Sequence, residues 1–277
     1  MPDPVDLSRV RTVPLQQRPN KVSLTRFAKP PAKGQSAADF LAGLPHLLAG
    51  DDFRAVAQAV AAAHRAGRPV IVGFGAHVIK CGLSPVLIDL VNRGVVTALA
   101  TNGSGAIHDF ELALIGETSE DVAAGLKDGT FGMVKETGEL MHAAVNRALT
   151  RPDAGLGDLF GEYLEELAAP NRDVSLAVAC RRKGVPFTVH VAVGTDIIHM
   201  HPQADGAALG RASFNDFKRF CGAVKELSGG VYLNIGSAVV MPEVFLKAFT
   251  VAQNLGANLS GYTTVNMDMI AHYRSGE

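Results

Sequence analysis

Residues 70–105 read VIVGFGAHVIKCGLSPVLIDLVNRGVVTALATNGSG, and this stretch decides the fold. It holds two apolar runs, at 70–74 and 95–100. Between them lies a helical pattern that opens on Ser84-Pro85, a good pair for a cap and first turn. A strand, a helix and a second strand within about 30 residues are typical of a right-handed βαβ unit. The two runs are therefore predicted to be parallel strands of one sheet.

The same alternation continues toward the end of the chain. Further strands are expected at 186–193, 231–235 and 259–265, and helices at 36–48, 53–65, 174–182, 213–227 and 242–255. Residues 107–170 are mostly helical and are expected to form an insertion between strands. We therefore predict an α/β fold with a doubly wound, mostly parallel sheet. Residues 1–35, rich in proline, basic and polar residues, are expected to form an arm, and 36–277 a single domain.

Three of these helices have recognisable start signals. Asp51 and Asp52 offer an N-cap for the helix at 53–65, and Ser213 is expected to cap the helix at 213–227. The stretch 118–121 has the character of a capping box and is expected to begin a helix.

The composition excludes several classes of protein. Of the 277 residues, 47% are apolar and 19% charged, which allows a sizeable core. The net charge of -1 and the absence of tryptophan argue against a nucleic-acid partner. The three cysteines lie far apart, which fits reduced thiols in a cytosol. No apolar run is long enough for a membrane span, and the N-terminus lacks the apolar core of a signal peptide, so we expect a cytoplasmic protein.

Three turns of small residues follow predicted strands. They are Gly73-Phe74-Gly75, Asn102-Gly103-Ser104-Gly105 and Asn234-Ile235-Gly236-Ser237. If their strands are neighbours, the turns line one crevice, where glycine lets the phosphate of a ligand approach the backbone. The first turn lacks the third glycine of the common dinucleotide fingerprint. The alternative is that all three are tight turns needed only for packing.

Histidines beside carboxylates form two further candidate groups. His199 and His201 would face the same way if the chain is extended there, and Asp196 precedes them. This set could hold a divalent metal or transfer protons. In the other group His108, Asp109 and Glu111 follow the second glycine turn, where a histidine next to acids can be tuned as a base. The alternative is that these acids only favour a helix N-terminus.

Taken together, these stretches resemble deoxyhypusine synthase over roughly residues 50–265. That family has a nicotinamide-binding, Rossmann-like fold. It uses NAD to oxidise spermidine and passes the aminobutyl group, through an imine on its own lysine, to a lysine of a translation factor. Stretches 73–82, 98–109 and 236–241 resemble the family's NAD and substrate segments, and 196–201 resembles the segment whose catalytic histidine falls on His201. The resemblance implies NAD contacts at Gly75, Ala76, His77, Thr101, Asn102, Gly103, Ser104, Gly105, Asp196, Gly236 and Ser237.

Two departures from the family bear on the reaction. The imine-forming lysine falls on Met241, which cannot form an imine, and the paired glutamates of the polyamine site fall on Ile107 and His108. We therefore expect a deoxyhypusine synthase-like protein that is not a true deoxyhypusine synthase.

The leading hypothesis is an NAD-binding enzyme, of transferase or oxidoreductase type, that acts on a small amine or amino acid. Its catalytic candidates are His201, His108, Asp109 and His199. Two alternatives stay open: a metal-dependent hydrolase or lyase built on His199, His201 and Asp196, and a binding protein without catalysis. Because family members are homotetramers with NAD sites at subunit interfaces, the resemblance also implies a homo-oligomer, with a tetramer as the expected state.

Overall fold

The computed structural model describes residues 1–270, and the chain divides into two compact units, Met1–Ala57 and Gln58–Glu277. The N-terminal unit holds three 3-10 turns, η1 (Leu7–Arg9), η2 (Leu15–Gln17) and η3 (Leu24–Arg26), and the helix α1 (Ala37–Gly43). A capping box of Ser36 and Asp39 begins α1. The helix α2 (Ala49–Arg65) begins in the first unit and ends in the second, and Asp51 and Asp52 lie in its first turn instead of capping it.

The main unit is built on a five-stranded sheet in which every strand is parallel. Its strands are β1 (Val70–Phe74), β2 (Ala98–Asn102), β3 (Phe187–His190), β4 (Val231–Ile235) and β5 (Thr263–Met267). They lie in the order β3-β2-β1-β4-β5, with the fully buried β1 at the centre. The predicted parallel α/β fold is confirmed, and β1 and β4 have the predicted bounds.

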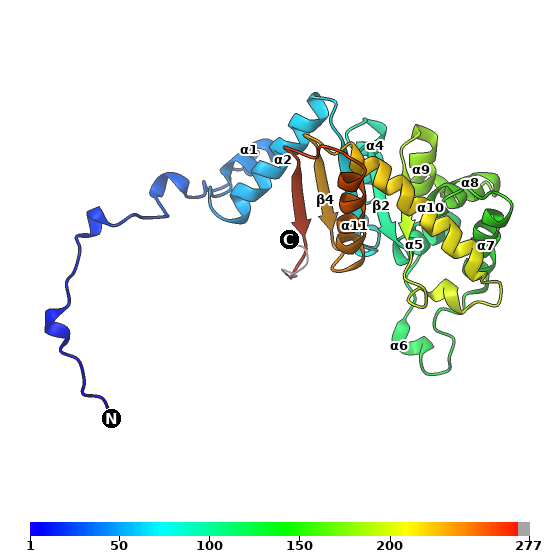
Figure 1. Ribbon diagram of the computed structural model, residues 1–277, viewed down its shortest axis with the longest axis horizontal. Helices are drawn as coiled ribbons and strands as arrows, with labels where there is room; N and C mark the ends of the chain where they lie inside the picture. The colour runs from blue at the N-terminus through cyan, green and yellow to red at the C-terminus, as the bar shows by residue number, and fades with distance from the viewer. Residues whose placement is uncertain (271–277) are drawn as a thin grey trace. The chain divides into compact units, whose positions relative to one another are not determined.

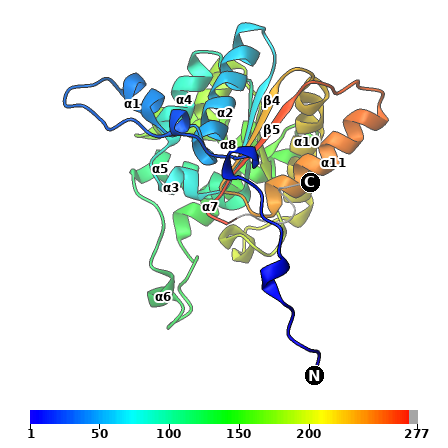
Figure 2. The ribbon, with the colours of Figure 1, turned by 90° about the vertical axis from the view of Figure 1, so that its left-hand side faces the viewer.

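Helices cover both faces of this sheet (Figures 1 and 2). The helices after β1 are α3 (His77–Lys80), α4 (Ser84–Asn92), α5 (Gly103–Ile115), α6 (Val122–Gly125), α7 (Lys135–Val145), α8 (Leu156–Glu166), α9 (Leu176–Lys183), α10 (Gly206–Lys225) and α11 (Val240–Asn254). Of these, the short α6 lies on a loop that projects away from the sheet. Three 3-10 turns connect them: η4 (Asn146–Leu149), η5 (Arg172–Val174) and η6 (Ile197–Met200). The predicted helical insertion is present as α5 to α8, between β2 and β3.

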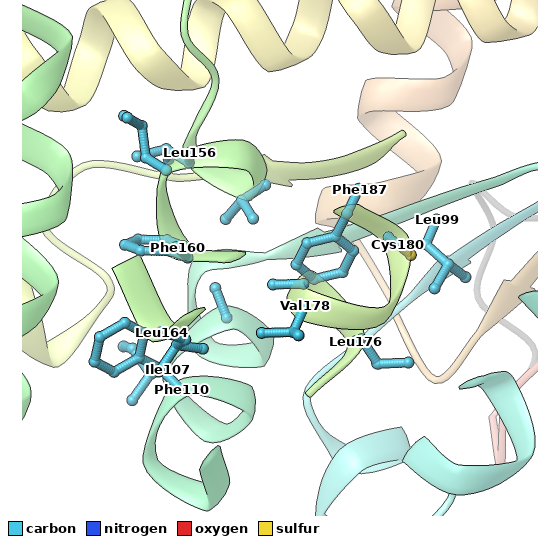
Figure 3. Close-up of a cluster of buried hydrophobic side chains, with 14 of the residues drawn as sticks. Leu99, Ile107, Phe110, Leu156, Phe160, Leu164, Leu176, Val178, Cys180 and Phe187 are labelled. Carbon is cyan, nitrogen blue, oxygen red and sulfur yellow. The ribbon is translucent and has the colours of Figure 1, made fainter. Parts of the chain in front are cut away.

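The alternation of side chains along the strands creates two cores. On one face Val72, Phe74 and Leu99 pack with α4, α5, α8 and α9, and the opposite face packs Ile71 against α10 and α11. Figure 3 shows the first core where α5, α8 and α9 meet β2 and β3. There the rings of Phe110 and Phe160 meet edge to face, with their centroids 5.8 Å apart.

Two buried carboxylates attach the insertion to the sheet. Asp216 of α10, fully buried, accepts hydrogen bonds from the backbone N–H groups of Gly157 (3.0 Å) and Val189 (2.9 Å), so it joins the start of α8 to β3. Asp109 joins α5 to the start of α9. Its carboxylate accepts hydrogen bonds from the Ser175 hydroxyl (2.6 Å) and the Leu176 N–H (2.7 Å). Both carboxylates thus satisfy backbone donors at helix starts that no intrahelical carbonyl can reach.

Several predicted helix starts were wrong for identifiable reasons. Helix α10 begins at Gly206 and not at Ser213, because Asp205 caps it by accepting from the Ala208 N–H at 2.8 Å. The Ser213 hydroxyl instead donates to the Val189 carbonyl of β3. The stretch 118–121 is not helical, and Asp121 caps the single turn of α6. In residues 1–270 no helix is both long and apolar enough to cross a membrane.

Candidate functional site

The order of the strands reverses beside β1, where a crevice is expected. The chain runs from β1 to β2 and β3 on one side and then crosses to β4 on the other side of β1. In open α/β sheets, ligands bind at such a reversal, outside the carboxyl ends of the two strands concerned. The turns that follow β1 and β4 therefore border this crevice, and they contain five of the residues expected to bind NAD: Gly75, Ala76, His77, Gly236 and Ser237.

These two turns touch each other closely. The Gly75 N–H donates to the Ile235 carbonyl at 3.0 Å, and a Cβ on Gly75 would lie 2.1 Å from the carbonyl oxygen of Gly236. Gly236 itself has a left-handed backbone (φ 61°), and a Cβ there would meet no atom within 4 Å. Gly75 is thus required by the packing of the two turns, whereas the space beside Gly236 is open.

The third turn of small residues is the first turn of helix α5. Asn102 caps this helix by accepting from the Gly105 N–H at 2.9 Å. A Cβ on Gly105 would lie 2.1 Å from Thr101 Oγ1, and one on Gly103 would lie 2.0 Å from Asp196 Oδ2. Contacts within the protein therefore account for both glycines.

The carboxylate of Asp196 occupies the N-terminal end of α5. It is 9% exposed and accepts a hydrogen bond from the Ser104 N–H, where the helix dipole favours negative charge. Burial nevertheless raises the pKa of Asp196 to about 6. The protein thus places one of its own anions where the phosphate of a ligand would have been expected.

A pocket of about 570 Å³ runs along one face of α5. Ser104, His108, Glu111 and Ile115 line it from this helix, at the three- and four-residue spacing that puts side chains on one face. Its other walls are Lys80 of α3, the connection from α5 to α7, the first turn of α7, and the segment 195–197 before and within η6.

Most of the charged side chains that line this pocket are acidic. There are five, Glu111, Glu117, Glu120, Glu136 and Asp196, against a single lysine, Lys80, and no arginine. Within residues 1–270 none of the five forms an ion pair with a lysine or arginine. By contrast, Glu162, which lies in the same unit but outside the pocket, forms ion pairs with three arginines. The charged side chains that line the pocket therefore carry a net negative charge.

A chain of hydrogen bonds crosses the floor of the pocket. His108 Nδ1 lies 2.6 Å from Thr118 Oγ1, and the Thr118 hydroxyl donates to Glu111 Oε2 at 2.5 Å. The Thr137 hydroxyl donates to the other oxygen of Glu111 at 2.8 Å. Burial is the main cause that lowers the pKa of His108, and the nearby Glu111 opposes it. The imidazole, the hydroxyl and the carboxylate thus form one connected group.

The structure directs His199 and His201 to different partners. They would face the same way only in an extended chain, and residues 197–200 form the turn η6 instead. The ring of His201 points at the Gly132 carbonyl, with Nε2 2.8 Å from its oxygen. His199 Nδ1 accepts instead from the backbone N–H groups of Gly194 and Asp196. In the described part of the chain, no three His, Cys, Asp or Glu side chains are grouped closely enough to hold a metal ion.

Two other predicted residues lie outside the pocket. Asp109 is 2% exposed, and its carboxylate is directed at the start of α9. Met241, which the resemblance aligned with the lysine of deoxyhypusine synthase, is fully buried with Phe220, Phe245 and Ala248 in the core between the sheet and α10 and α11.

Of the partners that complete the His108 group, Glu111 was among the acids that the sequence placed beside this histidine, one helical turn beyond it. Thr118, Thr137 and Glu136 had no detectable signal, because the connection from α5 to α7 brings them to the pocket through tertiary folding.

No protein-family model and no curated protein matches this chain. Among solved structures it is similar to apo ArgZ, an arginine dihydrolase from cyanobacteria (17% identity, 78% of this chain, TM-score 0.48), and to AgrE in complex with ornithine and NAD+ (16%, 80%, TM-score 0.47). It is also similar to a deoxyhypusine synthase, described as putative, from Entamoeba histolytica (12%, 87%, TM-score 0.47). This chain spans 27% and 31% of the length of the first two proteins and 90% of the third.

Proposed function

We propose that this protein is an NAD-dependent enzyme that acts on a small amine or amino acid bound in the acidic pocket along α5. The observation that carries the proposal is the set of five carboxylates around one cavity, none of which pairs with a lysine or arginine within residues 1–270. Carboxylates held close together repel each other, so a cationic ligand stabilises them. A protonated amine supplies this positive charge together with up to three hydrogen-bond donors.

The turns after β1 and β4 fit a dinucleotide better than the start of α5. Asp196 and Asn102 already satisfy N–H groups at the start of α5, whereas the space beside Gly236 is open. We therefore assign cofactor binding to Gly75, Ala76, His77, Gly236 and Ser237. When bound, NAD would accept a hydride from the carbon that carries the amine.

The buried position of Met241 supports a reaction other than deoxyhypusine synthesis. A side chain at this position lies in an apolar core, on the opposite side of the sheet from the core that contains α5. The proposal therefore keeps the oxidation of an amine and excludes transfer through an imine at position 241. A cytoplasmic homo-oligomer, with a tetramer as the expected state, remains part of the proposal.

Two binding measurements test the proposal. Titration calorimetry should detect the binding of either NAD or NADP, and the variant His77→Ala should bind this nucleotide more weakly. The control is His64→Ala, which changes an exposed histidine outside the proposed site and should leave the affinity unchanged. Absence of binding of both nucleotides at millimolar concentration would overturn the redox assignment and leave a binding protein for amines.

The substrate class is tested by NADH absorbance with a panel of amines and amino acids. Glu136→Gln removes one lining carboxylate from α7, and we expect KM to rise by up to about fivefold, the effect of losing about 1 kcal/mol at a solvated site. Glu139→Gln on the same helix, whose side chain does not line the pocket, is the matched control. An equal effect of both variants would contradict an amine site in this pocket.

A further inference from the structure

We infer that His108 is the base that removes the proton from the substrate amine, acting through Nε2, and that Thr118 and Glu111 hold it in the tautomer that this requires. The identity of the substrate rests on the proposed function, whereas the tautomer follows from the structure alone. Neither the predicted base His201 nor Asp109 lines the pocket, and His108 is its only histidine within residues 1–270.

The hydrogen bonds from His108 through Thr118 to Glu111 determine the tautomer of His108. A carboxylate can only accept hydrogen bonds, so the single hydrogen of the Thr118 hydroxyl is directed to Glu111 Oε2. The Thr118 oxygen must then accept the hydrogen of the 2.6 Å contact with His108, which places that hydrogen on Nδ1. In the neutral ring Nε2 is therefore without a proton and can take one.

Glu111 is itself held in place from a second direction. Its other oxygen accepts from the Thr137 hydroxyl of α7 at 2.8 Å, so both carboxylate oxygens are engaged. His108 and Glu111 come from α5, Thr118 from the loop that follows, and Thr137 from α7. This arrangement resembles the way in which an acid orients a catalytic histidine, here with a hydroxyl inserted between the two.

The surroundings of the ring favour its neutral form. Burial is the main cause that lowers the pKa of His108, Lys80 and His77 lower it further, and Glu111 opposes them. The remaining charged groups that line the pocket are the carboxylates Glu117, Glu120, Glu136 and Asp196. A neutral imidazole with a free nitrogen is the form that accepts a proton.

The proposed step balances in atoms and charge. His108 Nε2 takes one proton from the substrate ammonium, which leaves a neutral amine with a lone pair. With NAD bound, that lone pair could form the C=N bond while the cofactor accepts the hydride from the adjacent carbon. The products would be an iminium ion, NADH and a protonated His108, which would return its proton to water.

Nitrogen NMR of the imidazole rings tests the tautomer without substrate or NAD. The His108 signals are assigned from their loss in His108→Gln. We expect the Nδ1-protonated form in the wild-type protein, a mixture of tautomers in Thr118→Val, and recovery in Thr118→Ser. A wild-type His108 protonated on Nε2, or a tautomer unchanged in Thr118→Val, would overturn the inference even if the proposed function holds.

Kinetics on an amine that the enzyme oxidises test the base. We expect His108→Gln to lower kcat by about 10²- to 10⁴-fold, the usual contribution of general base catalysis, with NAD binding retained. Thr118→Val should lower kcat with little change in KM and move the acidic limb of the pH profile, and Thr118→Ser should restore both. A kcat of His108→Gln within about threefold of wild type would refute the role as base. If the wild-type protein does not bind NAD, the proposed function is refuted instead.

Discussion

Asp216→Asn is expected to stabilise this protein at alkaline pH. Both backbone donors to this fully buried side chain, Gly157 and Val189, contact the same oxygen, Oδ2. An asparagine can therefore keep both bonds with its carbonyl oxygen. The other oxygen, Oδ1, has only a long contact of 3.4 Å with Arg219, which also binds Asp158 and so keeps a partner.

The size of the effect follows from the ionisation of Asp216. Burial raises its pKa from 3.8 to about 7. The folded protein thus retains this proton in a pH range where the unfolded chain has lost it. The resulting stabilisation is complete below pH 3.8 and is lost as the pH rises through 7, with a total of about 4 kcal/mol. Asparagine does not ionise, so its advantage over the wild type should grow by about 3 kcal/mol between about pH 5 and pH 8.

Guanidinium unfolding of both proteins at these two pH values measures this difference. A variant that is less stable than the wild type at the higher pH, or a difference that does not change with pH, would refute the reasoning. Asp216→Ala is the control: it removes the acceptor of two buried N–H groups and should destabilise the protein by about 2–6 kcal/mol.

Three further substitutions test other contacts. Asp109→Asn should destabilise the protein by about 2–4 kcal/mol in the same unfolding assay. Both carboxylate oxygens accept from backbone N–H groups at the start of α9, and the side-chain amide of asparagine would direct its own N–H at one of these donors. An unchanged stability would contradict the role of Asp109 as the cap of α9. Gly103→Ala should cost about 1–3 kcal/mol, because its Cβ would displace the carboxylate of Asp196, and a neutral result would show that this contact is loose. Met241→Lys should lower the stability by several kcal/mol without creating a lysine that borohydride can trap with a carbonyl compound, and a trapped adduct would contradict the buried position.

The sequence predicted best the strands and helices whose first and last residues are determined by neighbouring residues in the chain. Strand β4 follows Gly229-Gly230, and its bounds were correct. Strand β2 was placed too early, because its end depends on distant contacts: the Thr101 hydroxyl donates to the Phe74 carbonyl of the neighbouring strand. The start of α10 failed for the same reason, since Ser213 has the properties of a cap but its hydroxyl bonds to β3.

The candidate site depends even more than the strands and helices on contacts between distant parts of the chain, so less of it could be predicted from the sequence. The spacing of small residues after strands indicated a crevice, and the strand order supports it for the turns after β1 and β4. The same signal at Gly103 and Gly105 has an explanation in packing, which only the positions of Asp196 and Thr101 reveal. The acidic pocket was not predicted, because its walls come from separate segments of the chain and no spacing within one segment encodes them.

The pairing of β1 with β4 has a consequence for how this protein folds. The two central strands are neighbours in the sheet, yet Gly75 and Gly236, which touch at their ends, lie about 160 residues apart in the chain. Strands β1, β2 and β3 can assemble before β4 joins them, whereas the last pairing must close a long loop at an entropic cost. The crevice between β1 and β4 is therefore expected to be among the last parts of the molecule to form. During synthesis it cannot exist until the ribosome has released β4.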